Sequence, residues 1–154
     1  MEEERGPPRW FYKKGTTPPT DDAYFENMTR IIFQAGLSWR LIERKWPNFR
    51  RAFENFSIER VAHFGEDDVK RLMADKGIVR NRRKILATIY NAKQFQAIKK
   101  EFGSFQSYIK TLDKSNNYAP VIKELSKKFK HLGPSSARIF LYSVGEDVRY
   151  TPEG

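Results

Sequence analysis

The stretch HLGPSSARIFLYSVG, residues 131–145, predicts a tight turn that leads into a helix. Gly133 and Pro134 are typical of a turn, and Ser135 or Ser136 is a candidate to cap the helix that follows. Apolar side chains then recur at helical spacing and predict one buried face: Ala137, Phe140, Leu141 and Val144. Because the residues before the turn are also helical in pattern, the stretch predicts two helices joined by a hairpin.

Such a hairpin leaves several backbone N–H groups free at the start of its second helix. Those groups and the positive end of the helix dipole bind phosphate without reading base sequence. A plain connection between two helices is the alternative, and this stretch alone does not exclude it.

The rest of the chain predicts further helices, and no strand or fixed-period repeat is evident. Asp21 or Asp22 is the expected N-cap of the first helix, and Pro47 is expected to end the second. Residues 1–20 contain four prolines and two glycines, so we expect a flexible arm. Residues 21–154 are expected to form one all-α domain, a bundle of short helices. The helices are expected within these ranges: 21–34, 39–47, 57–64, 66–76, 81–102, 105–112 and 120–129.

The composition narrows the chemistry that this domain can perform. The 154 residues carry a net charge of +10 and no cysteine, which excludes disulfides and any cysteine-based metal site. The two histidines are far apart in sequence, so we expect no metal and no cofactor. No apolar run is long enough for a membrane span, and the acidic N-terminus does not resemble a signal peptide. We therefore expect an intracellular protein, in the cytoplasm with the nucleoid or in a nucleus, and a monomer.

The excess of positive charge gathers at the start of one predicted helix. In GIVRNRRKI, residues 77–85, four cations stand close together: Arg80, Arg82, Arg83 and Lys84. Cations near a helix N-terminus oppose the local dipole, and a bound phosphate would offset that cost. A solvated face is the alternative, as solubility alone is the alternative for the net charge.

The stretch FQAGLSW, residues 33–39, places two large apolar side chains beside a small-residue turn. Leu37 and Trp39 are each compatible with ordinary core packing. An enzyme that flips a nucleotide out of a duplex needs a wedge for the vacated stack and an aromatic wall for the extruded base. Leu37 and Trp39 are candidates for these two roles.

Three stretches together resemble the DNA-3-methyladenine glycosylase I family of the helix-hairpin-helix DNA glycosylase superfamily. They are FQAGLSW at 33–39, GIVRNRRKILATIYNAK at 77–93 and FKHLGPSSARIFLYSVG at 129–145. Their order and spacing agree with the family over roughly residues 20 to 147. The resemblance implies a two-lobed helix-hairpin-helix fold with the active site in the cleft between the lobes. It also implies base excision repair, by hydrolysis of the N-glycosidic bond of alkylated purines in double-stranded DNA.

The resemblance also assigns roles to single residues. Gln34, Gly36 and Leu37 would enter the duplex, and Trp39 would stack on the flipped base. Trp10 and Tyr12 are candidates to close the base pocket, with ordinary packing as the alternative. The residues expected to hold phosphate at the hairpin are Leu132, Gly133, Ser135 and Ser136. Because Pro134 has no N–H, one donor is missing there.

The chain departs from the family at three places. A glutamate that binds the methylated adenine in the family is replaced by Ile31, which would extend the apolar wall of the pocket. The Cys/His zinc site of the family cannot be built, and the N-terminal arm matches the family poorly. The wider superfamily often has a hairpin lysine for lyase chemistry, but Ser135 or Ser136 stands near that position here, so no lyase activity is expected. Glu146 and Asp147 are candidates to stabilise the developing sugar cation, unless they are acids of a surface loop. A glycosylase for deaminated, oxidised or bulkier bases and a non-catalytic DNA- or lesion-binding protein are therefore the alternative functions.

Overall fold

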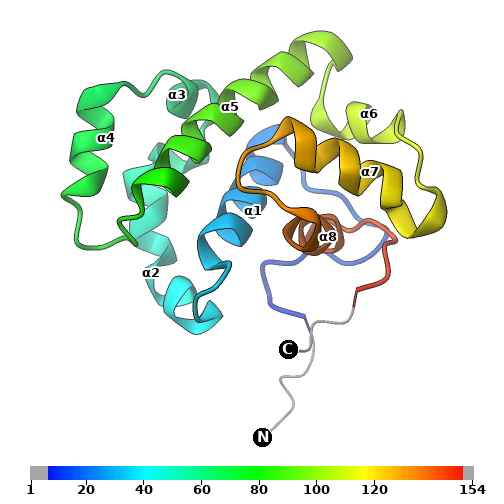
Figure 1. Ribbon diagram of the computed structural model, residues 1–154, viewed down its shortest axis with the longest axis horizontal. Helices are drawn as coiled ribbons and strands as arrows, with labels where there is room; N and C mark the ends of the chain where they lie inside the picture. The colour runs from blue at the N-terminus through cyan, green and yellow to red at the C-terminus, as the bar shows by residue number, and fades with distance from the viewer. Residues whose placement is uncertain (1–6, 151–154) are drawn as a thin grey trace, which may run out of the picture.

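The computed structural model describes residues 7–150 and consists of helices joined by short loops (Figure 1). The helical segments of the described residues are α1 (Asp21–Gln34), α2 (Trp39–Ala52), the 3-10 helix η2 (Glu54–Phe56), α3 (Ile58–Ala62), α4 (Glu66–Met73), α5 (Arg82–Phe102), α6 (Phe105–Lys110), α7 (Ser115–Lys128) and α8 (Pro134–Ser143). The all-α expectation is confirmed. Residues 1–6 of the expected arm and residues 151–154 of the expected domain lie outside the described residues.

Helices α1 and α5 occupy the middle of the molecule (Figure 1). Helices α2, α3 and α4 lie on one side of this pair, and α6, α7 and α8 lie on the other. One hydrophobic core runs through both sides. Aromatic rings supply much of it, since the ring of Trp46 stacks on Phe49 at 4.8 Å and on Phe56 at 5.2 Å between centroids.

The start of α1 differs from the expectation that Asp21 or Asp22 caps it. The cap is Thr20, whose hydroxyl oxygen accepts a hydrogen bond from the N–H of Ala23 at 3.1 Å. Both aspartates instead hold the starts of other helices. Asp21 accepts from the N–H of Phe105 at 3.0 Å, and Asp22 accepts from the N–H of Ile58 at 3.0 Å.

Prolines have different effects in α2 and α7. The expectation that Pro47 ends the second helix is wrong, because α2 continues to Ala52. Phe49, one turn before that end, is fully buried, so packing outweighs the lost backbone hydrogen bond. In α7, residues 116–118 have positive φ values, so Pro120 stands in the first turn of the regular part.

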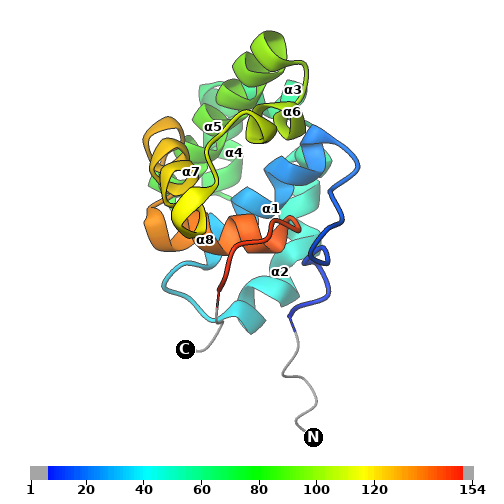
Figure 2. The same ribbon diagram turned by 90° about the vertical axis from the view of Figure 1, so that its right-hand side faces the viewer.

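The described part of the arm is docked on the end of α8 (Figure 2). The N–H of Tyr12 donates to the carbonyl of Ser143 at 2.8 Å, and the N–H of Gly15 donates to that of Gly145 at 2.9 Å. Gly145 has a φ of +88°, and a Cβ there would lie 2.0 Å from the carbonyl oxygen of Thr16. Only glycine allows the arm to approach so closely.

Residues 7–150 hold no helix that is both long and apolar enough to cross a bilayer. They also hold no group of three or more histidine or acidic side chains placed to ligate a metal ion.

Candidate nucleic-acid interface

The turn between α1 and α2, residues 34–38, exposes the predicted wedge. Gly36 has a φ of +79° and open space around it, which lets the chain reverse between the helices. The N–H of Leu37 donates to the carbonyl of Gln34 at 3.0 Å, and the side chain of Leu37 is 39% exposed. Ser38 then caps α2, since its hydroxyl oxygen accepts from the N–H of Leu41 at 3.2 Å. The tip of this wedge turn is therefore a leucine that the protein leaves in solvent.

Gln34 lies inside the protein and not at the tip of the wedge turn. Its side chain is only 2% exposed, and both amide atoms are buried without a hydrogen-bond partner among the described residues. A buried side chain cannot enter a duplex without rearrangement of its surroundings. Of the three residues predicted to enter the duplex, Gly36 and Leu37 are exposed and Gln34 is not.

Lys84 reaches from α5 to the end of α1. Its ammonium donates to the carbonyl of Phe33 at 3.3 Å and to that of Ala35 at 3.1 Å. Helix α1 has no basic residue in its own last turn, so Lys84 supplies the positive charge that a helix C-terminus favours. Burial lowers the pKa of Lys84. The structure thus gives this predicted phosphate ligand a second role, which is to hold the wedge turn.

The hairpin between α7 and α8 has free donors where the sequence predicted them. The expected serine cap is wrong, because Gly133 is the N-cap and makes no side-chain bond. Pro134 occupies the first turn of α8, and the first N–H bonded back to the carbonyl of Gly133 is that of Ala137, at 2.8 Å. The backbone N–H groups of Ser135 and Ser136 therefore remain for a ligand. Leu132 is 2% exposed and anchors the loop in the core.

Asn91 of α5 holds the hairpin by both ends of its amide. Its side-chain oxygen accepts from the N–H of Lys130 at 2.8 Å, and its side-chain nitrogen donates to the carbonyl of Lys130 at 3.1 Å. Asn91 is 1% exposed. Sequence reasoning missed this residue, although an asparagine on the apolar stripe of a long helix was a usable signal, because a buried amide needs partners.

The basic start of α5 lies beside the hairpin. Asn81 caps this helix, and Arg80, Arg82 and Arg83 are exposed. Burial and the positive charges of Arg83 and Lys84 lower the pKa of His131 in the hairpin. The structure therefore brings the arginine cluster, the hairpin and the wedge turn together around one helix.

The predicted base-pocket residues do not meet in one cavity. Trp39 is half-buried, and its ring lies 6.3 Å from that of Phe11, which in turn lies 5.7 Å from Tyr142. Trp10 and Tyr12 line a cavity of about 310 Å³ beneath the arm. Ile31 is 1% exposed and belongs to the hydrophobic core, so it forms no wall of that cavity.

The two candidate carboxylates have different surroundings. Glu146 is half-buried and accepts a hydrogen bond from the hydroxyl of Tyr118 at 2.8 Å. Burial and this bond raise the pKa of Tyr118 to about 12. Asp147 is exposed and forms an ion pair with Lys14 at 3.1 Å. Of the two, Glu146 is the carboxylate held in a defined position, and Asp147 is an acid of the surface.

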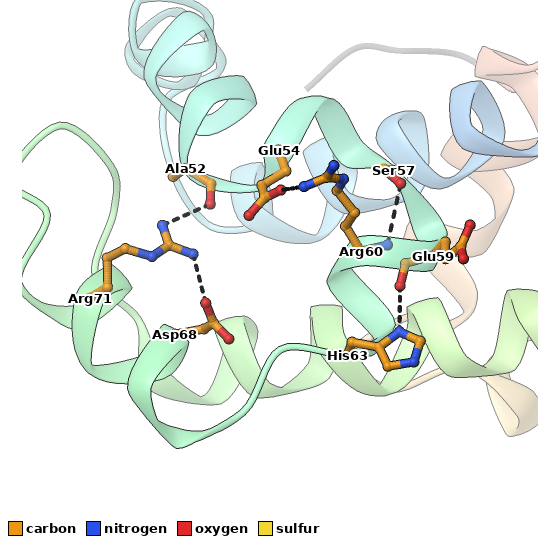
Figure 3. A network of polar contacts seen from close by, with 8 residues as sticks. All are labelled: Ala52, Glu54, Ser57, Glu59, Arg60, His63, Asp68 and Arg71. Atoms are coloured by element: carbon orange, nitrogen blue, oxygen red, sulfur yellow. Dashed lines mark hydrogen bonds and ion pairs between the residues drawn. The ribbon is translucent and has the colours of Figure 1, made fainter.

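A second group of charged side chains lies around α3 and α4 (Figure 3). The ring Nδ1 of His63 lies 2.8 Å from the carbonyl of Glu59. Arg60 pairs with Glu54 at 2.8 Å, and Arg71 donates to the carbonyl of Ala52 at 3.0 Å. The two arginine contacts fasten α3 to η2 and α4 to the end of α2, which is a structural role.

Residues 10–140 match the sequence profile of the methyladenine glycosylase family. The chain belongs to this family. The match includes the wedge turn, the basic start of α5 and the hairpin up to Phe140 of α8, so the family spans all three parts of the interface.

Named relatives agree with the family. The chain is 40% identical to DNA-3-methyladenine glycosylase 1 of Escherichia coli K12 over 93 residues, 60% of this chain and 50% of the relative. It is 30% identical to DNA-3-methyladenine glycosylase of Haemophilus influenzae Rd over 101 residues, 66% of this chain and 53% of the relative. It therefore spans about half the length of the curated relatives it matches.

Solved structures extend the likeness to the whole fold. The structure of 3-methyladenine DNA glycosylase I from Staphylococcus aureus superposes with a TM-score of 0.76 at 26% identity, over 93% of this chain and 87% of that one. A crystal structure of another 3-methyladenine DNA glycosylase I gives a TM-score of 0.73 at 30% identity, over 86% and 83% of the two chains.

Proposed function

We propose that this protein is a monofunctional DNA glycosylase of base excision repair. It hydrolyses the N-glycosidic bond of damaged purines, alkylated bases in the first place, in double-stranded DNA, and it acts as a monomer. The observation that supports this most directly is the exposed Leu37 on a turn that α5 holds beside the basic cluster and the hairpin. What distinguishes Leu37 from an ordinary exposed leucine is its place at the tip of a turn beside cationic side chains and free backbone N–H groups, where a wedge that enters a duplex would stand.

The first step of the proposed mechanism is the anchoring of phosphate. The N–H groups of Ser135 and Ser136 hold one phosphate, and the side chains of Arg82 and Arg83 contact the DNA backbone. These contacts set the position of the protein on the duplex. They carry no information about the base, so recognition must come from elsewhere.

Extrusion of the base follows. Leu37 fills the vacated stack, and the ring of Trp39 stacks on the extruded base. The bond between the base nitrogen and C1′ of the sugar breaks, and its electron pair stays with the base. Water adds to C1′ and loses a proton, which leaves an abasic site. Glu146 is the carboxylate proposed to stabilise the positive charge that develops on the sugar.

The absence of a lysine at positions 135 and 136, after the hairpin turn, favours hydrolysis without strand cleavage. The residues after Pro134 are serines, and neither supplies an amine that could attack C1′ to form a Schiff base. The product expected from this protein is therefore an abasic site in an intact strand.

The test is release of free base from duplex DNA treated with a methylating agent, identified by mass spectrometry. We expect methylated purines in the supernatant and abasic sites in the strand. Leu37→Ala should lower the rate at least about tenfold, which corresponds to roughly 1.4 kcal/mol of flipping free energy, while affinity for undamaged duplex changes little. The matched control is Leu86→Ala, because Leu86 is a similarly exposed leucine, at 43%, away from the turn.

A second candidate is a glycosylase of altered specificity. It is favoured by Ile31, an apolar core residue at the position of the family's recognition glutamate. A panel of duplexes with deaminated, oxidised and alkylated bases separates the two. Tight binding of damaged duplex with no release of any base would instead indicate a non-catalytic lesion-binding protein.

A further inference from the structure

The cavity beneath the arm has the features of a binding site for a flat, polar ligand. We call it the arm cavity, with a volume of about 310 Å³. Three aromatic residues of the arm cover it, and polar residues of α1 and α2 form its floor. The lining residues used below are Trp10, Phe11, Tyr12, Glu26, Arg30 and Arg50. Its size is at the lower end of small-molecule pockets, which suits a single nucleobase.

Arg30 is the unusual group in this floor. Its side chain is only 8% exposed, and its Nε is buried without a hydrogen-bond partner among residues 7–150. The guanidinium lies 4.4 Å from the ring centroid of Trp10 and 5.3 Å from that of Trp46. The rings stabilise the cation through their faces, but they accept none of its in-plane hydrogen bonds.

The acid that lines the cavity with Arg30 has other partners. Glu26 accepts hydrogen bonds from the indole N–H of Trp46 and from Nε of Arg50, both at 2.8 Å. Burial lowers the pKa of Arg30 to about 10, which is still far above neutral pH. Arg30 is therefore a buried cation that lines the cavity and leaves its Nε without a partner among residues 7–150, an arrangement that is costly unless a ligand supplies acceptors.

The fork of an arginine selects among purines by their acceptors. A 6-oxopurine presents two acceptors on one edge, O6 and N7, which match a bidentate guanidinium. Adenine presents one acceptor and one donor on the same edge, so its amino group would face the N–H groups of the arginine. The positive charge of the cavity floor also favours a neutral base. Arg30 and Arg50 outnumber Glu26 in the floor, which disfavours a cationic alkylated base relative to a neutral one.

The arm cavity is adjacent to the wedge turn. Arg30 stands one helical turn before Gln34, on the same stripe of α1. Phe11 lines the cavity, and its ring lies 6.3 Å from that of Trp39. A base that leaves the duplex at Leu37 and stacks on Trp39 therefore has the arm cavity next to it.

We propose that the arm cavity receives the extruded base and that Arg30 reads O6 and N7 of a neutral 6-oxopurine. Hypoxanthine, the base formed by deamination of adenine, is the simplest ligand of this class. This inference rests on the proposed function for the flipping step. It adds a deaminated, non-alkylated base to the proposed substrates, and it assigns a recognition residue on a different face of α1 from Ile31.

The test compares two neutral bases, hypoxanthine and adenine. Hypoxanthine has an oxygen at position 6 and a proton on N1, whereas adenine has an amino group at position 6 and no proton on N1. Quenching of tryptophan fluorescence by free hypoxanthine and by free adenine reports binding, because Trp10 covers the cavity. Single-turnover release from duplexes that carry one hypoxanthine or one 3-methyladenine reports catalysis. The wild type should favour hypoxanthine over adenine by roughly tenfold or more, within the usual range for one bidentate pair.

The variant Arg30→Lys keeps the charge and the contact with both rings but loses the fork. It should lose most of the preference for hypoxanthine and keep a circular dichroism spectrum like that of the wild type. The matched control is Arg71→Lys, the same substitution at an arginine that also lies over an aromatic ring, 5.3 Å from the centroid of Phe64, but that does not line the arm cavity. It should keep the preference. If the Arg30 variant fails to fold, the preference of the wild type still decides the question.

The outcomes separate this inference from the proposed function. Release of 3-methyladenine without any preference for hypoxanthine overturns the role of Arg30 and leaves the glycosylase proposal intact. Arg30-dependent binding of hypoxanthine with no base released from any duplex supports the site and overturns the glycosylase proposal. Equal binding of hypoxanthine and adenine by the wild type overturns the inference outright.

Discussion

The wedge turn and the hairpin are both held by α5, but by different chemistry. The wedge turn is held by the charged end of Lys84, a long half-buried side chain with bonds of 3.1 and 3.3 Å to carbonyls. The hairpin is held by Asn91, a short, neutral and fully buried side chain with bonds of 2.8 and 3.1 Å to one backbone unit.

This difference agrees with what each loop is proposed to do. A phosphate anchor has to keep its N–H groups in place, which a short buried amide achieves because it has few rotamers to lose. A wedge has to adjust as it enters the duplex, and a flexible lysine stem follows such movement while its charge still favours the helix end. Helix α5 therefore holds the hairpin through a short side chain with little freedom and the wedge turn through a long flexible one.

The largest effect is expected for Asn91→Ala. It removes two hydrogen bonds of a buried side chain and leaves the N–H and the carbonyl of Lys130 without these partners in a partly buried place, which costs about 3 kcal/mol. The melting temperature in a calorimeter should fall by roughly 6–12 °C for a protein of this size. Gln94→Ala is the control, because Gln94 makes one bond, to the carbonyl of Lys128 at 3.0 Å, and should lose only about 1 kcal/mol. Equal losses would show that Asn91 holds the hairpin no more firmly than a single ordinary hydrogen bond would.

A smaller effect is expected for Lys84→Met. The variant keeps the apolar stem and loses both hydrogen bonds at the end of α1, which costs about 1 kcal/mol. If these two hydrogen bonds position Leu37 for entry into the duplex, the fraction of a 2-aminopurine reporter base that is extruded from the duplex should fall roughly fivefold. Lys84→Arg, which keeps donors and charge, should restore most of the fluorescence. A loss confined to overall DNA affinity would show instead that Lys84 serves mainly as a phosphate ligand.

The smallest effect concerns His131 and pH. Burial and the charges of Arg83 and Lys84 lower its pKa from the ordinary value of 6.5, so the free protein disfavours the protonated ring. Bound phosphate offsets those charges and raises the pKa. DNA binding therefore takes up protons, and affinity should rise as the pH falls through about 6.5, on the order of threefold.

Fluorescence anisotropy between pH 5.5 and 7.5 measures this slope. His131→Asn is the control, because asparagine tolerates the positive φ of 59° at this position but does not titrate. If the DNA affinity of His131→Asn changes with pH as steeply as that of the wild type, another group is responsible for the pH dependence.

The sequence by itself determined the helices, the hairpin and the turn that carries Leu37. These features depend on local chemistry. Apolar spacing predicts a helical face, Ser38, Ser57 and Asn81 cap helices by contacts within three residues, and Gly36 allows a turn. The same reasoning failed where a distant partner competed, as at Asp21 and Asp22, whose carboxylates are taken by the N–H groups of Phe105 and Ile58.

Only the tertiary structure decided which polar groups are free and which are already bonded. Lys84 and Arg82 look alike in the sequence, yet one is bonded to the end of α1 and the other is exposed. Gln34 reads as a wedge residue and lies buried, whereas Arg30 reads as an ordinary helix cation and faces a cavity. The physical reason is that burial and hydrogen bonding depend on segments far apart in the chain, and a local pattern contains no record of those partners.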